Sequence, residues 1–468
     1  MSALWTSQEM EAATLGRATR PFGAHGVSID TRTLKTGDLF VALKGDGRDG
    51  HAFVLTALAQ GAAAAMVSRP PNDTNSDARL LVVANTLRGL EDLGRAARAR
   101  AKAQIVAVTG SAGKTTTKEM LRLALAALGP TYASLSSYNN HWGVPLSLAQ
   151  LPRNCAYGVF EIGMNHFGEI RALVGYARPD VTVVTTIAPA HLEYFGSIDA
   201  IADAKAEIFE GLSRGGTAIV PSGNPCTARL VARAKQAGAE RILTFGESTG
   251  SDARLLSWSE TAAATHVEAE ICGRPCAFGI GAAGAHMAHN ALAALLAVAA
   301  LGGDINQPAA ALAAFAALQG RGARLAISLG DGSVEIIDES YNANPASMRA
   351  ALALLGSAKP RAGGRRIAVL GDMLELGAES ASLHTALAAP VDNARADLVF
   401  ACGRDMRALF DVLPASRRGS WGETSSEIAP EVVRSSRAGD VILVKGSLGS
   451  RMAVILDALR SGGGAQQP

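Results

Sequence analysis

Cysteine is scarce in this sequence, with five residues in a chain of 468. An odd and widely spaced set does not form a disulfide framework, so we expect reduced thiols. Two of them, Cys272 and Cys276, precede His286 and His289, but the spacing differs from that of common structural zinc sites. We therefore expect two buried thiols and two helix histidines there rather than a zinc centre.

Charge of one sign and long apolar runs are also missing. The formal net charge is +2 and no basic block stands out, which argues against a nucleic-acid partner or an acidic membrane surface. The longest apolar segment, around 291–301, has the length of a core helix. The N-terminus has no basic region followed by an apolar stretch. We expect a cytoplasmic monomer without membrane insertion that acts on small molecules.

The most informative segment that is present covers residues 105–121, where a β-branched run, a glycine turn and a helical pattern follow one another. Gly110 and Gly113 would let backbone N–H groups approach phosphate oxygens at the positive end of the helix. Lys114 would reach the terminal phosphates of a nucleotide, and the Thr115 hydroxyl would ligate Mg²⁺. The predicted site for ATP or GTP consists of Gly110, Ser111, Ala112, Gly113, Lys114, Thr115 and Thr116.

The spacing of this loop is unusual. It reads Gly-x-x-Gly-Lys-Thr, which is two residues shorter than the usual nucleotide-binding loop. Two other segments, at 45–50 and 279–284, match the Gly-x-Gly-x-x-Gly pattern of dinucleotide sites. In the first, Asp46 and Asp49 would repel a pyrophosphate, and in the second no returning strand completes a βαβ unit. We therefore expect no dinucleotide cofactor.

The chain is too long for a single core. At roughly 100–200 residues per domain, its length predicts about three domains. We expect an α/β fold throughout, with a small N-terminal module over residues 1–85. A central doubly wound domain of the P-loop ATPase type would cover 86–321, and a C-terminal Rossmann-like domain would cover 322–468.

Short apolar runs predict the strands of these domains. In the first module, residues 38–44 and 62–68 are strand-like and residues 51–61 are helical, and a charged helix over 87–102 leads to the phosphate strand. Strand, loop and helix then repeat from residue 105 to about residue 320. The strands expected in the other two domains cover residues 157–162, 181–187, 217–221, 334–338, 366–370, 398–402 and 441–445.

Three further polar residues stand at the ends of these strands or just beyond them. Glu161 ends an apolar run, His191 follows another, and Lys205 lies in the next helical stretch. Each alone would be read as a surface or core residue. Because ligands bind at the carboxyl ends of the strands in α/β sheets, the three could surround one metal–nucleotide site together with the phosphate loop.

With these residues, the chain resembles the Mur ligase family, the ATP-dependent amide-forming enzymes of peptidoglycan precursor synthesis. The resemblance extends from about residue 25 to residue 450. It implies that Thr115 and Glu161 hold one of two Mg²⁺ ions. His191 and Lys205 would serve the second ion, with Lys205 carrying a carbamate. Lys114, His191 and Lys205 are thereby implied as catalytic residues.

The resemblance also assigns the residues around the nucleotide. It continues through Gly284-x-His286-x3-Asn290 and Gly320-Arg321 to Asp338. His286 and Asn290 would lie near the adenine of ATP, Arg321 toward the phosphates and Asp338 toward the ribose.

One kind of family member matches best. The segment from Ser28 to Gly45 is similar to the UDP-binding segment of members that add the third residue or the terminal dipeptide. Segments at 139–145, 165–169, 338–345 and 370–377 look like the member that joins D-alanyl-D-alanine to UDP-N-acetylmuramoyl-tripeptide through an acyl phosphate. The implied substrate contacts are Ser28, Asp30, Thr31, Arg32, Lys44, Gly45, Asn139, Asn140, Asn165, His166, Tyr341, Asn342 and Asn344.

Three alternatives stay open at this point. A third-residue ligase should carry an Asp-Asn-Pro-Arg motif, which this sequence lacks. A folylpolyglutamate synthase should have its phosphate loop near the N-terminus, whereas here more than 100 residues precede Gly110. A non-catalytic nucleotide-dependent binding protein would not need Glu161, His191 and Lys205. His141-Trp142 and Glu339 depart from the expected pattern, and this departure concerns the expected local substrate contacts and not the expected reaction.

Overall fold

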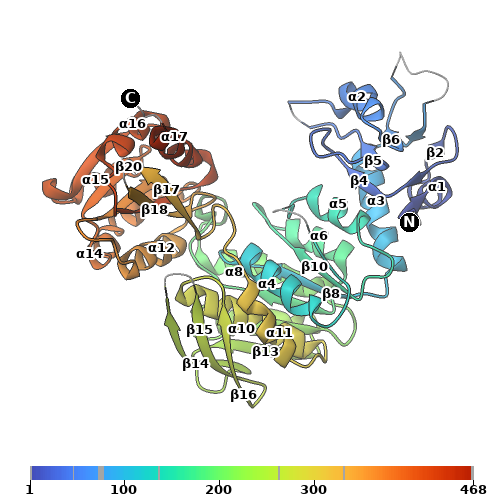
Figure 1. Ribbon diagram of the computed structural model, residues 1–468. Coiled ribbons are helices and arrows are strands. Elements are labelled where there is room, and N and C mark those ends of the chain that lie inside the picture. The colour runs from blue at the N-terminus through green and yellow to red at the C-terminus, as the bar shows by residue number, and fades with distance from the viewer. Residues whose placement is uncertain are drawn as a thin grey trace.

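The computed structural model describes residues 3–45, 47–71, 78–134, 138–261, 264–329 and 332–464. They form three α/β units in chain order, each with a sheet of its own. Figure 1 shows the N-terminal unit (blue) and the C-terminal unit (orange to red) on either side of the central unit. No helix in these ranges is long and apolar enough to cross a membrane.

The N-terminal unit has a five-stranded sheet in the order β2-β7-β6-β5-β4, in which only β2 is antiparallel to its neighbour. The strand-like and helical segments expected here are confirmed, with shorter bounds. The elements are β1 (Trp5–Thr6), α1 (Ser7–Thr14), β2 (Arg17–Ala18), β3 (Gly23–Ala24), β4 (Gly26–Ser28), β5 (Asp38–Val41), η1 (Gly50–Phe53), α2 (Val54–Ala59), β6 (Ala64–Val67) and β7 (Leu80–Val82).

Helix α3 (Thr86–Arg100) connects this unit to the next one, close to the helix expected from the sequence. The side chain of Asn85 caps its first turn by accepting a hydrogen bond from the Arg88 amide. Leu90 and Leu93 on its apolar face are buried in the core of the N-terminal unit, which also includes residues of α5. The helix therefore belongs to the packing of both units.

The central unit has nine strands in the order β16-β15-β14-β13-β12-β11-β8-β10-β9. Its first elements are β8 (Gln104–Thr109), α4 (Lys114–Ala126), β9 (Thr131–Ala133), α5 (Gly143–Ala149), β10 (Tyr157–Glu161), α6 (Glu169–Ala177), β11 (Val181–Val184), α7 (Leu192–Phe195), α8 (Ile198–Ala206) and η2 (Glu207–Gly211). They are followed by β12 (Thr217–Pro221), α9 (Thr227–Gln236), β13 (Arg241–Gly246), β14 (Ala253–Glu260), β15 (Thr265–Ile271), β16 (Arg274–Ile280), α10 (Ala285–Ala300), α11 (Asn306–Ala311) and η3 (Leu312–Ala314).

Both faces of the parallel part of this sheet are covered by helices, as a doubly wound fold requires. Along β8, Val106 and Val108 join the core that contains α4 and α10, whereas Ile105 and Ala107 join the core that contains α5 and α6. Successive side chains of a strand point to opposite faces, so β8 is buried on both sides. This agrees with its uninterrupted apolar run.

The expectation of strand, loop and helix repeats up to residue 320 is wrong at one edge of the sheet. Strands β14, β15 and β16 form an antiparallel meander. Buried and exposed residues alternate along β15 from Thr265 to Ile271, because one face packs against α10 and the other faces water. Cys272 lies in the β15–β16 turn and is exposed, and Cys276 is only partly buried, so the expected burial of these two thiols is also wrong.

The C-terminal unit has six strands in the order β17-β18-β22-β19-β20-β21, parallel except for β17. All four strands expected here are found. The elements are β17 (Ala323–Leu329), β18 (Gly332–Glu339), α12 (Pro345–Ser357), β19 (Arg366–Gly371), η4 (Gly377–Glu379), α13 (Ser380–Thr385), α14 (Ala388–Asn393), β20 (Leu398–Cys402), α15 (Arg407–Val412), η5 (Ala415–Arg417), β21 (Arg418–Gly422), α16 (Ser425–Ser435), β22 (Val441–Lys445), η6 (Leu448–Ser450) and α17 (Ala453–Gly464).

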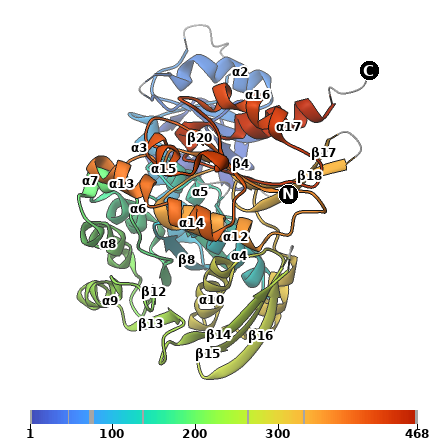
Figure 2. The same cartoon turned by 90° about the vertical axis from the view of Figure 1, so that its left-hand side faces the viewer.

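The central and C-terminal units touch at the carboxyl ends of their parallel strands. Helix α7 of the central unit contacts η4, the short helix before α13 of the C-terminal unit, and Figure 2 labels α7 and α13 at this junction. The carboxyl ends of strands in such sheets are where α/β folds bind ligands. The junction of these two units is therefore the expected position of a ligand-binding site.

Candidate active site

The phosphate loop joins β8 to α4 at the centre of the central sheet. Gly110 and Gly113 have φ angles of 150° and 80°, which side chains other than glycine rarely adopt. A Cβ on Gly110 would lie 1.9 Å from the Thr185 hydroxyl oxygen, and one on Gly113 would lie 2.5 Å from Asn290 Oδ1. Neighbouring side chains thus approach the loop so closely that both positions require glycine.

Lys114 begins α4, and its side chain folds back over the loop. Its Nζ donates a hydrogen bond to the Gly110 carbonyl oxygen at 2.8 Å. Burial lowers the pKa of Lys114, and the nearby Arg321 adds to this effect while Glu161 opposes it. Lys114 therefore sits where a phosphate could replace the carbonyl oxygen as its partner.

Glu161 stands at the end of β10, beside β8, and only 1% of it is exposed. Its carboxylate accepts hydrogen bonds from Thr115 Oγ1 and from Asn139 Nδ2, both at 2.7 Å. No lysine, arginine or histidine of the described residues forms an ion pair with it. A buried carboxylate beside a hydroxyl group offers the hard oxygen ligands that Mg²⁺ prefers. Thr115 and Glu161 thus fit one divalent cation.

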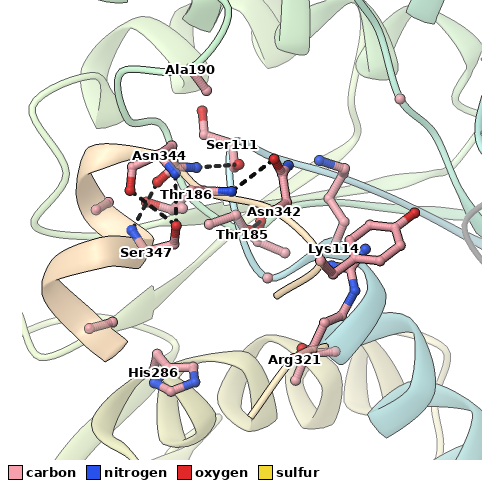
Figure 3. A pocket seen from close by; sticks show the side chains of 18 of the residues that line it. Ser111, Lys114, Thr185, Thr186, Ala190, His286, Arg321, Asn342, Asn344 and Ser347 are labelled. Carbon is pink, nitrogen blue, oxygen red and sulfur yellow. Dashed lines mark hydrogen bonds between the residues drawn. The ribbon is translucent and has the colours of Figure 1, made fainter. Parts of the chain in front are cut away.

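A cavity of about 780 Å³ lies where the central and C-terminal units meet. Figure 3 shows Ser111 and Lys114 of the phosphate loop, Arg321 and the asparagines Asn342 and Asn344 around it. The predicted site residues that line it are Ser111, Ala112, Gly113, Lys114, Thr116, Asn139, Asn140, Glu161, Asn165, His191, His286, Asn290, Arg321, Tyr341, Asn342 and Asn344. Those that do not are Ser28, Asp30, Thr31, Arg32, Lys44, Gly45, Gly110, Thr115, His166, Lys205 and Asp338.

Lys205 lies near the end of α8, does not line the cavity and is 2% exposed. Burial places the pKa of its amine well below the ordinary value, and the charge of Lys114 lowers it further. No carboxylate within the described ranges pairs with its Nζ. Those ranges also contain no group of three or more histidine, cysteine, aspartate or glutamate side chains arranged for a metal. The structure alone therefore supplies no complete second cation site.

His191 follows β11 and faces the cavity. Its ring Nδ1 is hydrogen-bonded to the Glu375 carboxylate of the C-terminal unit, and this bond lowers the pKa of Glu375. A second contact between the units joins Asn344 Nδ2 to the Ser111 carbonyl oxygen at 3.1 Å (Figure 3). The other end of the same amide caps α12 by accepting from the Ser347 amide. Both ends of Asn344 are thus already engaged within the protein.

Of the residues expected around the nucleotide, some line the cavity and one is buried away from it. His286 and Asn290 lie on α10 and line the cavity beside the phosphate loop, and burial lowers the pKa of His286, which favours its neutral form. The Arg321 guanidinium stacks 4.1 Å above the Tyr341 ring. Asp338 is fully buried instead, and its carboxylate accepts from the Gly320 amide at 2.8 Å and the Ser340 hydroxyl at 2.6 Å.

The UDP-substrate residues expected in the N-terminal unit lie away from the cavity. The Asp30 carboxylate accepts hydrogen bonds from the amide and guanidinium of Arg32, which lowers the pKa of Asp30. The Arg32 side chain is 82% exposed. Lys44 forms a β-bridge with Asp49. These residues form a turn and an isolated β-bridge, and their role in substrate binding stays a prediction.

Some residues at the cavity were missed in the sequence. The Thr185 hydroxyl donates to the Ala112 carbonyl oxygen at 2.5 Å and holds the phosphate loop against β11. Lys445, at the end of β22, is buried and binds Glu339 at 3.1 Å. Glu375 contacts His191 across 184 residues of sequence. The position of Thr185 at a strand end is a sequence signal for a site residue. The sequence around Glu375 contains no signal that predicts its contact with His191.

Three family profiles match the sequence in succession. They are described as Mur ligase family, catalytic domain (residues 23–120), Mur ligase middle domain (residues 108–298) and Mur ligase, glutamate ligase domain (residues 320–448). The sequence is 32% identical to the UDP-N-acetylmuramoyl-tripeptide–D-alanyl-D-alanine ligase of Rickettsia prowazekii, over 97% of this chain and 99% of that protein.

Solved structures agree with these matches. The fold is similar to a crystal structure of MurF from Acinetobacter baumannii, with a TM-score of 0.84, 31% identity and coverage of 98% and 99% of the two chains. It is also similar to the MurF ligase of Thermotoga maritima in complex with ADP, with a TM-score of 0.77, 26% identity and coverage of 94% and 98%. These similarities extend over all three units.

Proposed function

The chain belongs to the Mur ligase family, and we propose that it joins D-alanyl-D-alanine to UDP-N-acetylmuramoyl-tripeptide, with consumption of ATP, in peptidoglycan synthesis. One observation carries this proposal. The phosphate loop and Glu161 of the central unit line the same cavity as Asn342 and Asn344 of the C-terminal unit. A phosphoryl donor and an incoming amine could therefore meet there.

The reaction needs activation because the oxygen of a carboxylate is a poor leaving group. Transfer of the γ-phosphoryl group of ATP to the substrate carboxylate gives an acyl phosphate and ADP. The dipeptide amine then attacks the acyl carbon, and phosphate leaves from the tetrahedral intermediate. The first step brings two anions together, so Lys114 would offset their repulsion and the charge on the transferring group. When bound, Mg²⁺ at Thr115 and Glu161 would neutralise further phosphate charge.

Lys205 is proposed to carry a carbamate and, with His191, to serve a second Mg²⁺ ion. Its burial and depressed pKa support this, because carbamate formation consumes a neutral amine. The absence of a carboxylate partner among the described residues leaves Nζ available for the modification. A carbamate would also turn a group that repels cations into an anionic oxygen ligand.

We assign one ligand to each unit. Residues 1–85 would bind the UDP end of the substrate through Ser28, Asp30, Thr31, Arg32, Lys44 and Gly45. Residues 86–321 would bind ATP, with His286 and Asn290 near adenine and Arg321 toward the phosphates. Asp338, from the C-terminal unit, would act toward the ribose. Residues 322–468 would bind the dipeptide. We propose that the protein acts in the cytoplasm as a monomer.

The proposal is tested by mass spectrometry of a mixture of the protein, UDP-N-acetylmuramoyl-tripeptide, ATP and D-alanyl-D-alanine. We expect the pentapeptide product with ADP and phosphate. D-alanine or L-Ala-L-Ala should react far more slowly, since misplacing the amine by about 1 Å can cost roughly 100-fold in rate. Preferred addition of one amino acid to UDP-N-acetylmuramoyl-dipeptide would instead identify a third-residue ligase. Nucleotide binding without any product would identify a binding protein.

A further inference from the structure

The C-terminal unit contacts the central unit at two points beside the cavity. Glu375, in the loop between β19 and η4, bonds the His191 ring through its carboxylate and accepts a hydrogen bond from the Glu193 amide through its carbonyl oxygen at 3.1 Å. Asn344, at the start of α12, reaches the Ser111 carbonyl oxygen. One contact thus holds the phosphate loop, and the other holds the loop that carries His191.

These two contacts are connected within the central unit. The Ser111 hydroxyl donates to the Ala188 carbonyl oxygen at 2.9 Å and accepts from the Ala188 amide at 3.0 Å. The Ser111 amide also donates to the Thr186 carbonyl oxygen at 2.8 Å. The phosphate loop and the segment that leads to His191 are therefore hydrogen-bonded to each other, and each also bonds the C-terminal unit.

The backbone has an uncommon conformation at the contact between His191 and Glu375. His191 and Glu375 have φ angles of 59° and 64°, a left-handed conformation that residues with a Cβ seldom adopt unless their surroundings impose it. A Cβ on Gly377 would lie 3.3 Å from the Glu193 Cα, which shows how closely the two backbones approach. The pair is therefore held by packing on both sides rather than by one flexible side chain.

The contact leaves one nitrogen of the histidine available. Nδ1 is bonded to Glu375, whereas Nε2 has no hydrogen-bond partner within the part of the chain that the structure describes, and His191 lines the cavity. A histidine that binds a metal commonly bonds a carboxylate through its other nitrogen, which fixes the ring and strengthens the ligand. His191 shows this arrangement, with the carboxylate supplied by another unit.

We infer that Glu375 is a positioning residue, which orients His191 toward a divalent cation and makes the cation site of the central unit complete only when the C-terminal unit is docked. The inference rests on the proposed function for the role of the cation, but not on the identity of the amine that is joined. Docking of the dipeptide-binding unit would thereby be coupled to assembly of the phosphoryl-transfer site.

The test compares Glu375→Ala and Glu375→Gln with Glu379→Ala. Glu379 is an exposed glutamate of the same segment, and within the described residues its side chain forms no hydrogen bond or ion pair with the central unit. Binding of Mn²⁺, used as a spectroscopic substitute for Mg²⁺, is measured by electron paramagnetic resonance on the full chain with a non-hydrolysable ATP analogue. We expect Glu375→Ala to weaken one Mn²⁺ site by about 10- to 100-fold, Glu375→Gln to weaken it less, and Glu379→Ala to leave it unchanged.

A double-mutant cycle shows whether Glu375 acts through His191. In a His191→Ala background, Glu375→Ala should change Mn²⁺ affinity by less than about two-fold, because the partner it orients is gone. Thermal unfolding identifies any variant that fails to fold, and Glu375→Gln keeps the side-chain shape in that case. Mn²⁺ affinity of Glu375→Ala equal to that of Glu379→Ala, or an undiminished effect without His191, would overturn the inference. Neither measurement needs an amine substrate, so both stay informative if the product assay fails.

Discussion

The Lys114 side chain directs its charged end to the Gly110 carbonyl oxygen, where it can meet the charge of a ligand. Lys114→Ala should therefore keep the fold and lower phosphate release by about 10²- to 10³-fold or more, because a positioned cation at the developing charge is lost. Lys102→Ala is the matched control, since Lys102 is exposed just after α3. The two variants should unfold at similar temperatures. Near-normal turnover in a folded Lys114→Ala protein would contradict the assignment.

Lys205 allows a chemical test of the carbamate. Lys205→Ala should be nearly inactive, and short carboxylic acids added to the assay should restore part of the activity by supplying the missing carboxylate. The control is Lys118→Ala, because Lys118 is also buried but already bonds Glu119 and the Ser134 carbonyl oxygen. Its loss should act on stability and should not be rescued by acids. Equal rescue of both variants, or of neither, would count against a carbamate at Lys205.

Lys205 also leads to a prediction on how the stability of the fold depends on pH. Because its pKa in the folded chain lies well below 10.5, the unfolded chain binds more protons at this residue than the folded chain does. Stability should therefore rise with pH between the folded-state pKa and about pH 10. Lys205→Met should reduce this rise, which chemical unfolding at pH 7 and pH 9 would reveal. The same pH dependence in both proteins would mean that the amine stays protonated on folding.

At the scale of elements, the turn from β8 to α4 depends on close approach as well as on backbone freedom. Gly113→Ala adds a Cβ 2.5 Å from Asn290 Oδ1 at a φ of 80°. Gly302→Ala is a matched control, because Gly302 has a φ of 83° and no atom within 4 Å of the added Cβ. Both should lose stability through strain, by about 1 kcal/mol. Only Gly113→Ala should also lose ATP affinity, as calorimetry would show, and equal affinity in the two variants would refute this.

The strands that could be predicted from the sequence are those that are buried on both faces, because such burial produces a continuous apolar run. Strands β8, β10, β11 and β12 carry continuous apolar runs and appear near the expected positions. The β14–β16 meander was missed, because half of its side chains face water and its alternating pattern was not recognised. The proximity of Thr115 and Glu161 could be predicted, since each stands at an element end next to the phosphate strand. Glu375 could not be found, because its partner is far away in sequence and only the docking of two units brings them together.

At the scale of the whole molecule, the turn that is predicted to bind UDP belongs to the N-terminal unit, whereas the cavity lies between the central and C-terminal units. Arg32 is highly exposed and lines no part of the cavity, so Arg32→Ala should weaken binding of the UDP substrate much more than binding of ATP. The loss of a charge-assisted contact would cost about 1.5–3 kcal/mol, or roughly 10- to 100-fold in affinity. Calorimetry with each ligand measures this. Arg20→Ala, on another exposed turn of the same unit, is the control, and equal losses for both ligands would argue against the division.

The exposed turn of the meander has a practical consequence. Of the five cysteines, Cys272 alone is exposed, while Cys155, Cys226 and Cys402 are buried and Cys276 is partly covered. Cys272 lies between β15 and β16 in the central unit, and it does not line the cavity. The native chain thus carries its own attachment point for a fluorophore. Paired with a dye on a cysteine introduced into the C-terminal unit, it would turn the approach of the two units into an energy-transfer signal that can be followed during turnover.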